Sequence, residues 1–163
     1  MKPAPSPFIE LENIEYFRFE EDFVEKNVRC IPMIVRFKMD EVCIKLKLSE
    51  WSKFSVEERI ELAVMSCDNR EEATAFKSYL VQLITKYTRS EPSAMEYNIA
   101  PDWANATALP QVLLEKLLEF DLVVSTEQWA ALSNLQRFAL LKLCKSGHEN
   151  KNLPKALKEF GLG

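Results

Sequence analysis

Two stretches of this chain match each other at a single offset of 78 residues, without a gap. The offset pairs polar residues and prolines as well as one pair of tryptophans: Trp51 with Trp129, Pro32 with Pro110, Lys38 with Lys116, Glu41 with Glu119, Ser55 with Ser133 and Arg59 with Arg137. Apolar positions follow the same shift, as Ile44 and Leu122 do. Similarity at a fixed spacing indicates a repeated supersecondary unit. The sequence therefore predicts two related helix-turn-helix units, over about residues 31–66 and 109–144.

Each predicted unit contains a strong helix start. Ser55-Val56-Glu57-Glu58 and Ser133-Asn134-Leu135-Gln136 have the spacing of a capping box, in which the serine hydroxyl and the side chain three residues later each accept from a backbone N–H. The residues that follow are apolar almost all round, as in Phe138-Ala139-Leu140-Leu141. Such helices are usually buried, so we expect this pair at the centre of the core.

The rest of the chain fits around these units. Residues 1–13 carry three prolines and no period, which predicts a flexible tail. Tyr16–Glu20 alternates apolar and charged residues, which predicts a short extended segment. Only three glycines occur, a composition that favours helices over turn-rich sheets. The predicted fold is all-α, with one helical domain over residues 14–163.

Charge and hydropathy exclude several classes of function. The net charge of −4 and pI near 5.2 give no broad attraction to nucleic acid or anionic membranes, which also disfavours a helix-turn-helix DNA-binding protein. No apolar run approaches the ~20 residues needed to cross a bilayer. The N-terminal residues lack the apolar core of a signal peptide. We therefore expect a cytoplasmic protein.

The residue types that carry catalysis and bind metals are sparse. One histidine, His148, excludes a multi-histidine metal site or a His-centred triad built from one chain. The four cysteines, Cys30, Cys43, Cys67 and Cys144, match no zinc or CxxC spacing. No phosphate-binding glycine loop is present. The sequence predicts no catalytic residues, no bound metal and no cofactor.

Candidate binding residues fall in two segments. Arg29 and Arg36 flank an apolar run that contains Met33, and a polar loop contains four further candidates: His148, Glu149, Asn150 and Lys151. Arg59 and Arg137 stand in otherwise apolar helices, where each needs a partner. We expect contacts of Arg59 with Glu41 and of Arg137 with Glu119, although an arginine reserved for an anion is the alternative.

Several linear motifs resemble the conserved nitrate reductase-associated protein family over roughly residues 17–162. The matching motifs are Phe19-Glu20-x-Asp22-Phe23-Val24, Arg29-Cys30-Ile31-Pro32-Met33-x-Val35-Arg36-x-Lys38, Ile44-Lys45-Leu46-x-Leu48-x-x-Trp51, Gln128-Trp129-x-x-Leu132, Gln136-Arg137-Phe138-Ala139-Leu140, Gly147-His148-Glu149-Asn150-Lys151-Asn152 and Ala156-Leu157-x-Glu159-Phe160. The N-terminal tail is longer than the family pattern.

The resemblance implies a non-enzymatic accessory or maturation factor for assimilatory nitrate reductase. It implies nitrate reductase or its maturation machinery as partner, and it supplies no catalytic residues. The alternative is a regulatory module that senses a small anion through Arg29, Arg36, Arg59 or Arg137. An anion bound at one of these arginines would favour that alternative.

Overall fold

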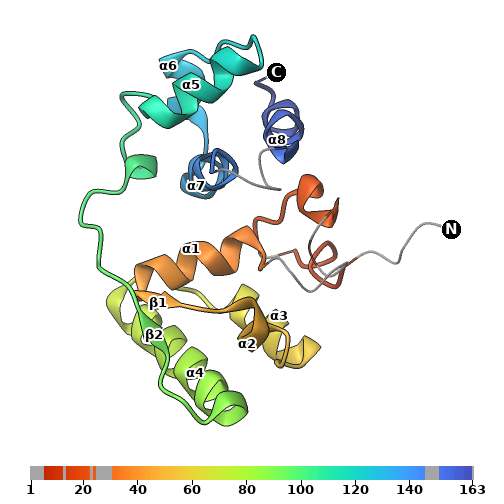
Figure 1. Cartoon of the computed structure of the whole chain (residues 1–163), viewed down its shortest axis with the longest axis vertical. Helices are drawn as coiled ribbons and strands as arrows, with labels where there is room; N and C mark the ends of the chain where they lie inside the picture. The colour runs from red at the N-terminus through yellow and green to blue at the C-terminus, as the bar shows by residue number, and fades with distance from the viewer. Residues whose placement is uncertain (1–5, 13, 23, 25–30, 146–150, 163) are drawn as a thin grey trace, which may run out of the picture. The chain divides into compact units, whose positions relative to one another are not determined.

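The computed structural model describes residues 6–12, 14–22, 24, 31–145 and 151–162. The described chain is mostly helical with one two-stranded sheet, so the prediction of a helical fold is confirmed at the level of class. It divides into two compact units, Met1–Tyr97 and Asn98–Gly163 (Figure 1). No helix in the described ranges has both the length and the apolarity to span a membrane.

The first unit packs α-helices around a small antiparallel sheet. Its elements are η1 (Arg18–Asp22), α1 (Met33–Glu41), β1 (Ile44–Lys45), α2 (Leu48–Trp51), α3 (Val56–Val64), α4 (Arg70–Thr88) and β2 (Ser93–Ala94). Ile44 pairs with Ala94 in the sheet. Helix α1 packs against α3 and α4, and α2 packs against α4 (Figure 1). The core gathers apolar side chains from all of these helices, among them Val35, Trp51, Leu62 and Phe76.

The segment before α1 differs from the sequence prediction. Arg18–Asp22 forms a 3₁₀ turn, so the extended segment predicted over Tyr16–Glu20 is wrong in its second half. Two side chains of this turn, Phe19 and Glu20, are buried. Alternation of apolar and charged residues over five positions is too short to separate a strand from one tight turn.

In its described residues, the second unit contains one 3₁₀ helix and four α-helices. Its elements are η2 (Asp102–Ala104), α5 (Gln111–Glu119), α6 (Thr126–Ala131), α7 (Asn134–Leu143) and α8 (Leu153–Glu159). Helix α7 packs against η2, α5 and α8. Six of its ten residues are buried, so the prediction of a central helix over this stretch is confirmed.

Helix α3 departs from that prediction. Its buried residues are Arg59, Leu62 and Ala63, whereas Val56 and Val64 are exposed. The helix therefore lies at the surface of the first unit with one face inward. The apolar run led to the prediction that Val64 belongs to the core, although single exposed apolar side chains are common on folded proteins.

Both capping boxes are confirmed. The Ser55 hydroxyl accepts from the Glu58 N–H at 3.1 Å, and the Glu58 carboxylate accepts from the Ser55 N–H at 2.8 Å. Ser133 and Gln136 exchange the same two bonds at the same distances. Because a capping box involves only residues three apart, the sequence is sufficient to predict it.

Candidate functional site

The predicted binding residues of the first segment differ in how far they are buried. Met33 is the first residue of α1 and is fully buried, so its side chain is not part of an exposed surface. Arg36 lies one turn later and is half-buried, and its Nε donates to the Ile31 carbonyl at 2.9 Å. Arg29 lies outside the described residues.

The second predicted segment is described only at its end. Lys151 is exposed and stands in the turn that leads into α8. His148, Glu149 and Asn150 lie outside the described residues. The proposal of a binding loop over residues 148–151 therefore remains a prediction.

The N-terminus of α1 is occupied by a carboxylate of the chain itself. Glu20 is fully buried, and its side chain accepts from the Met33 N–H at 2.7 Å and from the Phe17 N–H at 3.0 Å. Pro32, the residue before the helix, offers no side-chain cap. A helix N-terminus attracts anions, and here Glu20 supplies the anion, so this end of α1 is not an open anion site.

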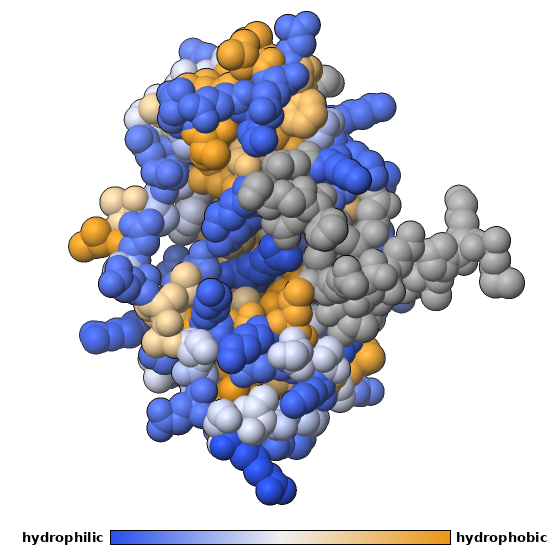
Figure 2. All heavy atoms as spheres, in the orientation of Figure 1, coloured by the Kyte–Doolittle hydropathy of each residue, from blue (hydrophilic) through white to orange (hydrophobic). Residues whose placement is uncertain are grey.

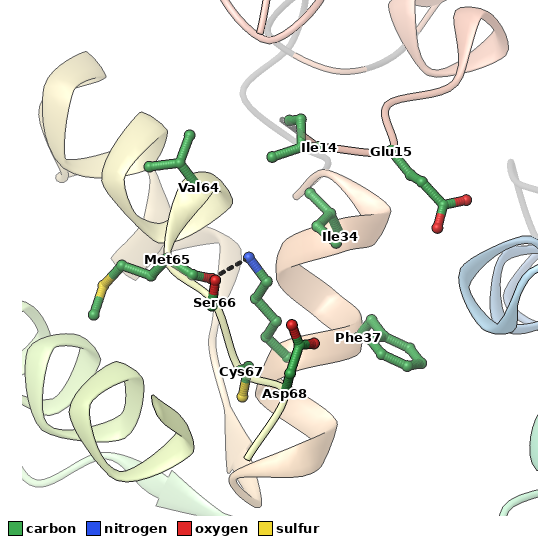
Figure 3. A pocket seen from close by; sticks show the side chains of 10 residues that line it. Ile14, Glu15, Ile34, Phe37, Val64, Met65, Ser66, Cys67 and Asp68 are labelled. Atoms are coloured by element: carbon green, nitrogen blue, oxygen red, sulfur yellow. Dashed lines mark hydrogen bonds between the residues drawn. The ribbon is translucent and has the colours of Figure 1, made fainter. Parts of the chain in front are cut away.

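A pocket of about 230 Å³ lies between α1 and the residues that follow α3 (Figure 3). Its lining combines apolar and polar residues: Ile14, Glu15, Ile34, Phe37, Lys38, Val64, Met65, Ser66, Cys67 and Asp68. Lys38 is its most unusual member, because lysine is almost never fully buried without a partner and this side chain is only 7 % exposed.

The Lys38 ammonium holds the C-terminal end of α3. Its Nζ donates to the Ala63 carbonyl at 2.7 Å. It also donates to the Met65 carbonyl at 2.5 Å, the bond drawn as a dashed line in Figure 3. The last carbonyls of a helix have no partner within it, and a cation is favourable there. Burial lowers the pKa of Lys38.

The residues of the pocket are better suited to binding a hydrogen-bond acceptor at the Lys38 ammonium than to catalysis. An ammonium has three N–H donors, and the bonds to Ala63 and Met65 use two of them. Burial raises the pKa of the nearby Cys67 thiol, which leaves little of the reactive thiolate. In the ranges that the structure describes, no three His, Cys, Asp or Glu side chains come together to hold a metal ion.

Arg59 packs on a tryptophan of its own unit. Its guanidinium carbon lies 5.5 Å from the centre of the Trp51 ring. Its Nε donates to the Trp51 carbonyl at 3.3 Å, and its Nη2 donates to the Ser52 carbonyl at 3.1 Å. The arginine thus holds the end of α2 against the start of α3.

Arg137 makes the corresponding contacts in the second unit. Its guanidinium carbon lies 5.8 Å from the centre of the Trp129 ring. It donates to four backbone carbonyls and one side chain: Trp103 at 2.7 Å, Trp129 at 3.3 Å, Ala130 at 3.4 Å, Leu132 at 2.7 Å and the Asn134 amide oxygen at 2.6 Å. The expected contact with Glu119 is wrong, because that carboxylate pairs with Lys116 at 3.0 Å. The partners of Arg137 are therefore backbone carbonyls, among them those at the end of α6, and not the Glu119 carboxylate.

Residues 16–160 match the family model described as conserved nitrate reductase-associated protein. The match includes Glu20, Lys38, both Arg–Trp pairs and residues of both units. Comparisons with curated proteins and with solved structures give no match.

Proposed function

Because the chain belongs to the conserved nitrate reductase-associated protein family, we propose that it is a non-enzymatic accessory or maturation factor for assimilatory nitrate reductase. The family match over residues 16–160 carries this proposal. The family is named for association with the reductase and not for a reaction of its own. A factor of this kind would act in the cytoplasm, on the reductase or on its maturation machinery.

The contacts of the unusual side chains support a binding protein over an enzyme. Buried arginines, lysines and carboxylates are the groups from which active sites are built. Here Glu20 caps a helix, Lys38 holds a helix end, and Arg137 binds backbone carbonyls. Structural roles account for all three.

We also propose that the two units are copies of one ancestral helical module. Helices α1 and α5 begin 78 residues apart, at Met33 and Gln111, and so do α3 and α7. Cys43 and Asp121, again 78 apart, both adopt the left-handed backbone region, with φ of 60° and 57°. A positive φ is uncommon for residues other than glycine. Its recurrence at one register supports common descent of the two units.

The hydrogen bonds of Arg137 and Arg59 weaken the alternative of a small-anion sensor. Four N–H···O contacts join Arg137 to backbone carbonyls, and one joins it to Asn134, so a guanidinium in this geometry has little capacity left for an anion. Arg59 holds its carbonyls in a similar way. Of the four arginines of that alternative, Arg36 is then the one described residue left as a candidate, and Arg29 lies outside the described residues.

Deletion of the gene tests the accessory role. In nitrate-grown cells we expect lower nitrate reductase activity, with no comparable loss of the reductase transcript, because a maturation factor acts after transcription. Re-expression of the wild-type chain should restore the activity. Normal growth on nitrate and unchanged reductase activity in the deletion strain would refute the proposal.

A charge reversal then tests the predicted surface at the start of α1. We expect Arg36→Glu, folded by circular dichroism, to restore only part of the activity. The matched control is Arg70→Glu, since Arg70 is an exposed arginine at the start of α4 in the same unit. Full activity with Arg36→Glu would remove this surface and leave the accessory role intact.

A further inference from the structure

Helix α5 has an apolar stripe on its outer side. Leu113 and Leu117 face the interior and are buried. Leu114 and Leu118, one turn apart on another face, are exposed, and the Leu118 side chain is 80 % exposed. Val123, shortly after the helix, is 87 % exposed. We call Leu114, Leu118 and Val123 the α5 face, and Figure 2 shows hydrophobic residues gathered where Figure 1 places α5.

The corresponding positions of the first unit show that the fold does not require these apolar residues. At the same register, 78 residues earlier, stand Arg36, Asp40 and Lys45. The inward positions do agree, because Val35 and Met39 are buried as Leu113 and Leu117 are. At these three positions the first unit thus has charged side chains, of which Arg36 and Asp40 are half-buried and Lys45 is exposed, where the second unit has exposed apolar side chains.

Acidic side chains stand on α5 and in the turn that follows it. Glu115, Glu119 and Asp121 are all exposed. The nearby Lys116 is 24 % exposed and its ammonium is paired with Glu119 at 3.0 Å. Of the four charged residues between Gln111 and Ser125, three are therefore acidic, and a partner with positive charges at its edge would be attracted.

We propose that the α5 face binds a basic amphipathic helix of a partner protein. Leucines one turn apart match the apolar ridge of such a helix, and lysines or arginines along its edges would meet Glu115, Glu119 and Asp121. This inference rests on the proposed function for the partner's identity, as part of nitrate reductase or its maturation machinery. The surface itself rests on the exposure of its residues and on the comparison with the first unit.

A second copy of this chain fits the face less well. A two-fold symmetric dimer places the same patch on both partners. Glu115, Glu119 and Asp121 of one copy would then approach the same acidic residues of the other, and like charges at an interface are unfavourable. These three acidic residues therefore favour a basic partner over self-association.

Two synthetic helical peptides of identical leucine pattern test the proposal, one with lysines and one with glutamates along the edges. With the full-length chain, fluorescence anisotropy should show saturable binding of the lysine peptide and much weaker binding of the glutamate peptide. Binding should weaken as salt is raised, since exposed charges are screened. Sedimentation velocity of the chain alone should show no self-association through this face.

The decisive variant carries the residues of the first unit: Leu114→Arg, Leu118→Asp and Val123→Lys. All three positions are exposed, so the variant should fold, and we expect it to bind the lysine peptide about tenfold more weakly, or worse. The control is Ile99→Lys, an exposed apolar residue of the same unit outside the face, which should bind as the wild type does. If Leu114→Arg fails to fold, Leu118→Asp alone makes the same test.

Equal binding of the lysine peptide by wild type and variant would overturn the proposal, and so would failure of the wild type to bind it. A dimer that the triple variant dissociates would also overturn it, in favour of a second copy. None of these results depends on the deletion phenotype. Loss of peptide binding together with failure to restore reductase activity would connect the face to the accessory role.

Discussion

The guanidinium of Arg137 lies over the Trp129 ring, 5.8 Å from its centre, and donates to the carbonyl of the same tryptophan at 3.3 Å. The Arg137 side chain thus stacks on the aromatic ring of Trp129 and also binds the backbone of the same residue. Trp129 is fully buried and its indole N–H donates to the Asn105 carbonyl at 2.8 Å. Arg137 and Trp129 therefore tie α6, α7 and the segment around η2 into one corner.

The forked geometry of Arg137 leads to the first prediction. Arg137→Lys keeps the charge but loses the planar group that reaches several carbonyls together. Carbonyls left without a donor in a buried corner cost about 1–3 kcal/mol, so we expect a loss of this size in urea unfolding. The control is Arg70→Lys, at an exposed position on α4, which should leave the unfolding midpoint unchanged. An unchanged midpoint for Arg137→Lys would show that an ammonium suffices.

The two serine caps give a second prediction. Ser55→Ala and Ser133→Ala each remove an acceptor for the first turn of a helix, and we expect each to lower the free energy of unfolding by about 0.5–2 kcal/mol. Ser78→Ala, at an exposed position inside α4, should be neutral or slightly stabilising, since alanine is the better helix former. Urea unfolding compares the three variants. Equal stability of all three would contradict the capping assignment.

Glu58 gives a third prediction, on acid stability. Burial would raise the pKa of Glu58, but bonds from the Ser55 N–H, Tyr87, Lys86 and the Ser55 side chain outweigh burial and lower it from 4.5 to about 2. The folded state therefore favours the ionised form, so the stabilisation is present above about pH 4.5 and is lost as the pH falls toward about 2.

Glu58→Gln isolates this contribution, because Gln136 shows that glutamine completes the same capping box. The stability difference between wild type and Glu58→Gln should be largest near neutral pH and should shrink as the pH falls toward 2. Urea unfolding at several pH values measures it, with Glu57→Gln at the exposed neighbouring position as control. A difference that stays constant over this range would mean that the bonds to Glu58 do not depend on its charge.

Lys38 and Lys116, at one register of the two units, give a fourth prediction. Lys38→Met leaves the Ala63 and Met65 carbonyls without their donor, and we expect a cost of about 1–3 kcal/mol. Lys116→Met removes an exposed ion pair with Glu119, and such pairs contribute about 0–1 kcal/mol. Hydrogen exchange read by mass spectrometry can assign each loss to its own unit. Equal effects in both units would show that the Lys38 bonds add nothing.

The sequence determined where α3 and α7 begin and what caps them. The offset of 78 residues predicts the register of both units, and the serine boxes are present as predicted because the bonding groups lie three residues apart. Local bonds and period decide these features, and both are written in consecutive residues.

Only the tertiary structure decided which partners the buried charges take. Lys38 and Lys116 occupy one register, yet Lys38 reaches carbonyls 25 and 27 residues away while Lys116 pairs with a neighbour on its own helix. Glu20 likewise caps a helix that begins 13 residues later. A buried charge takes whichever donors or acceptors the packing brings within reach, and that choice depends on contacts between segments that no single stretch of sequence contains.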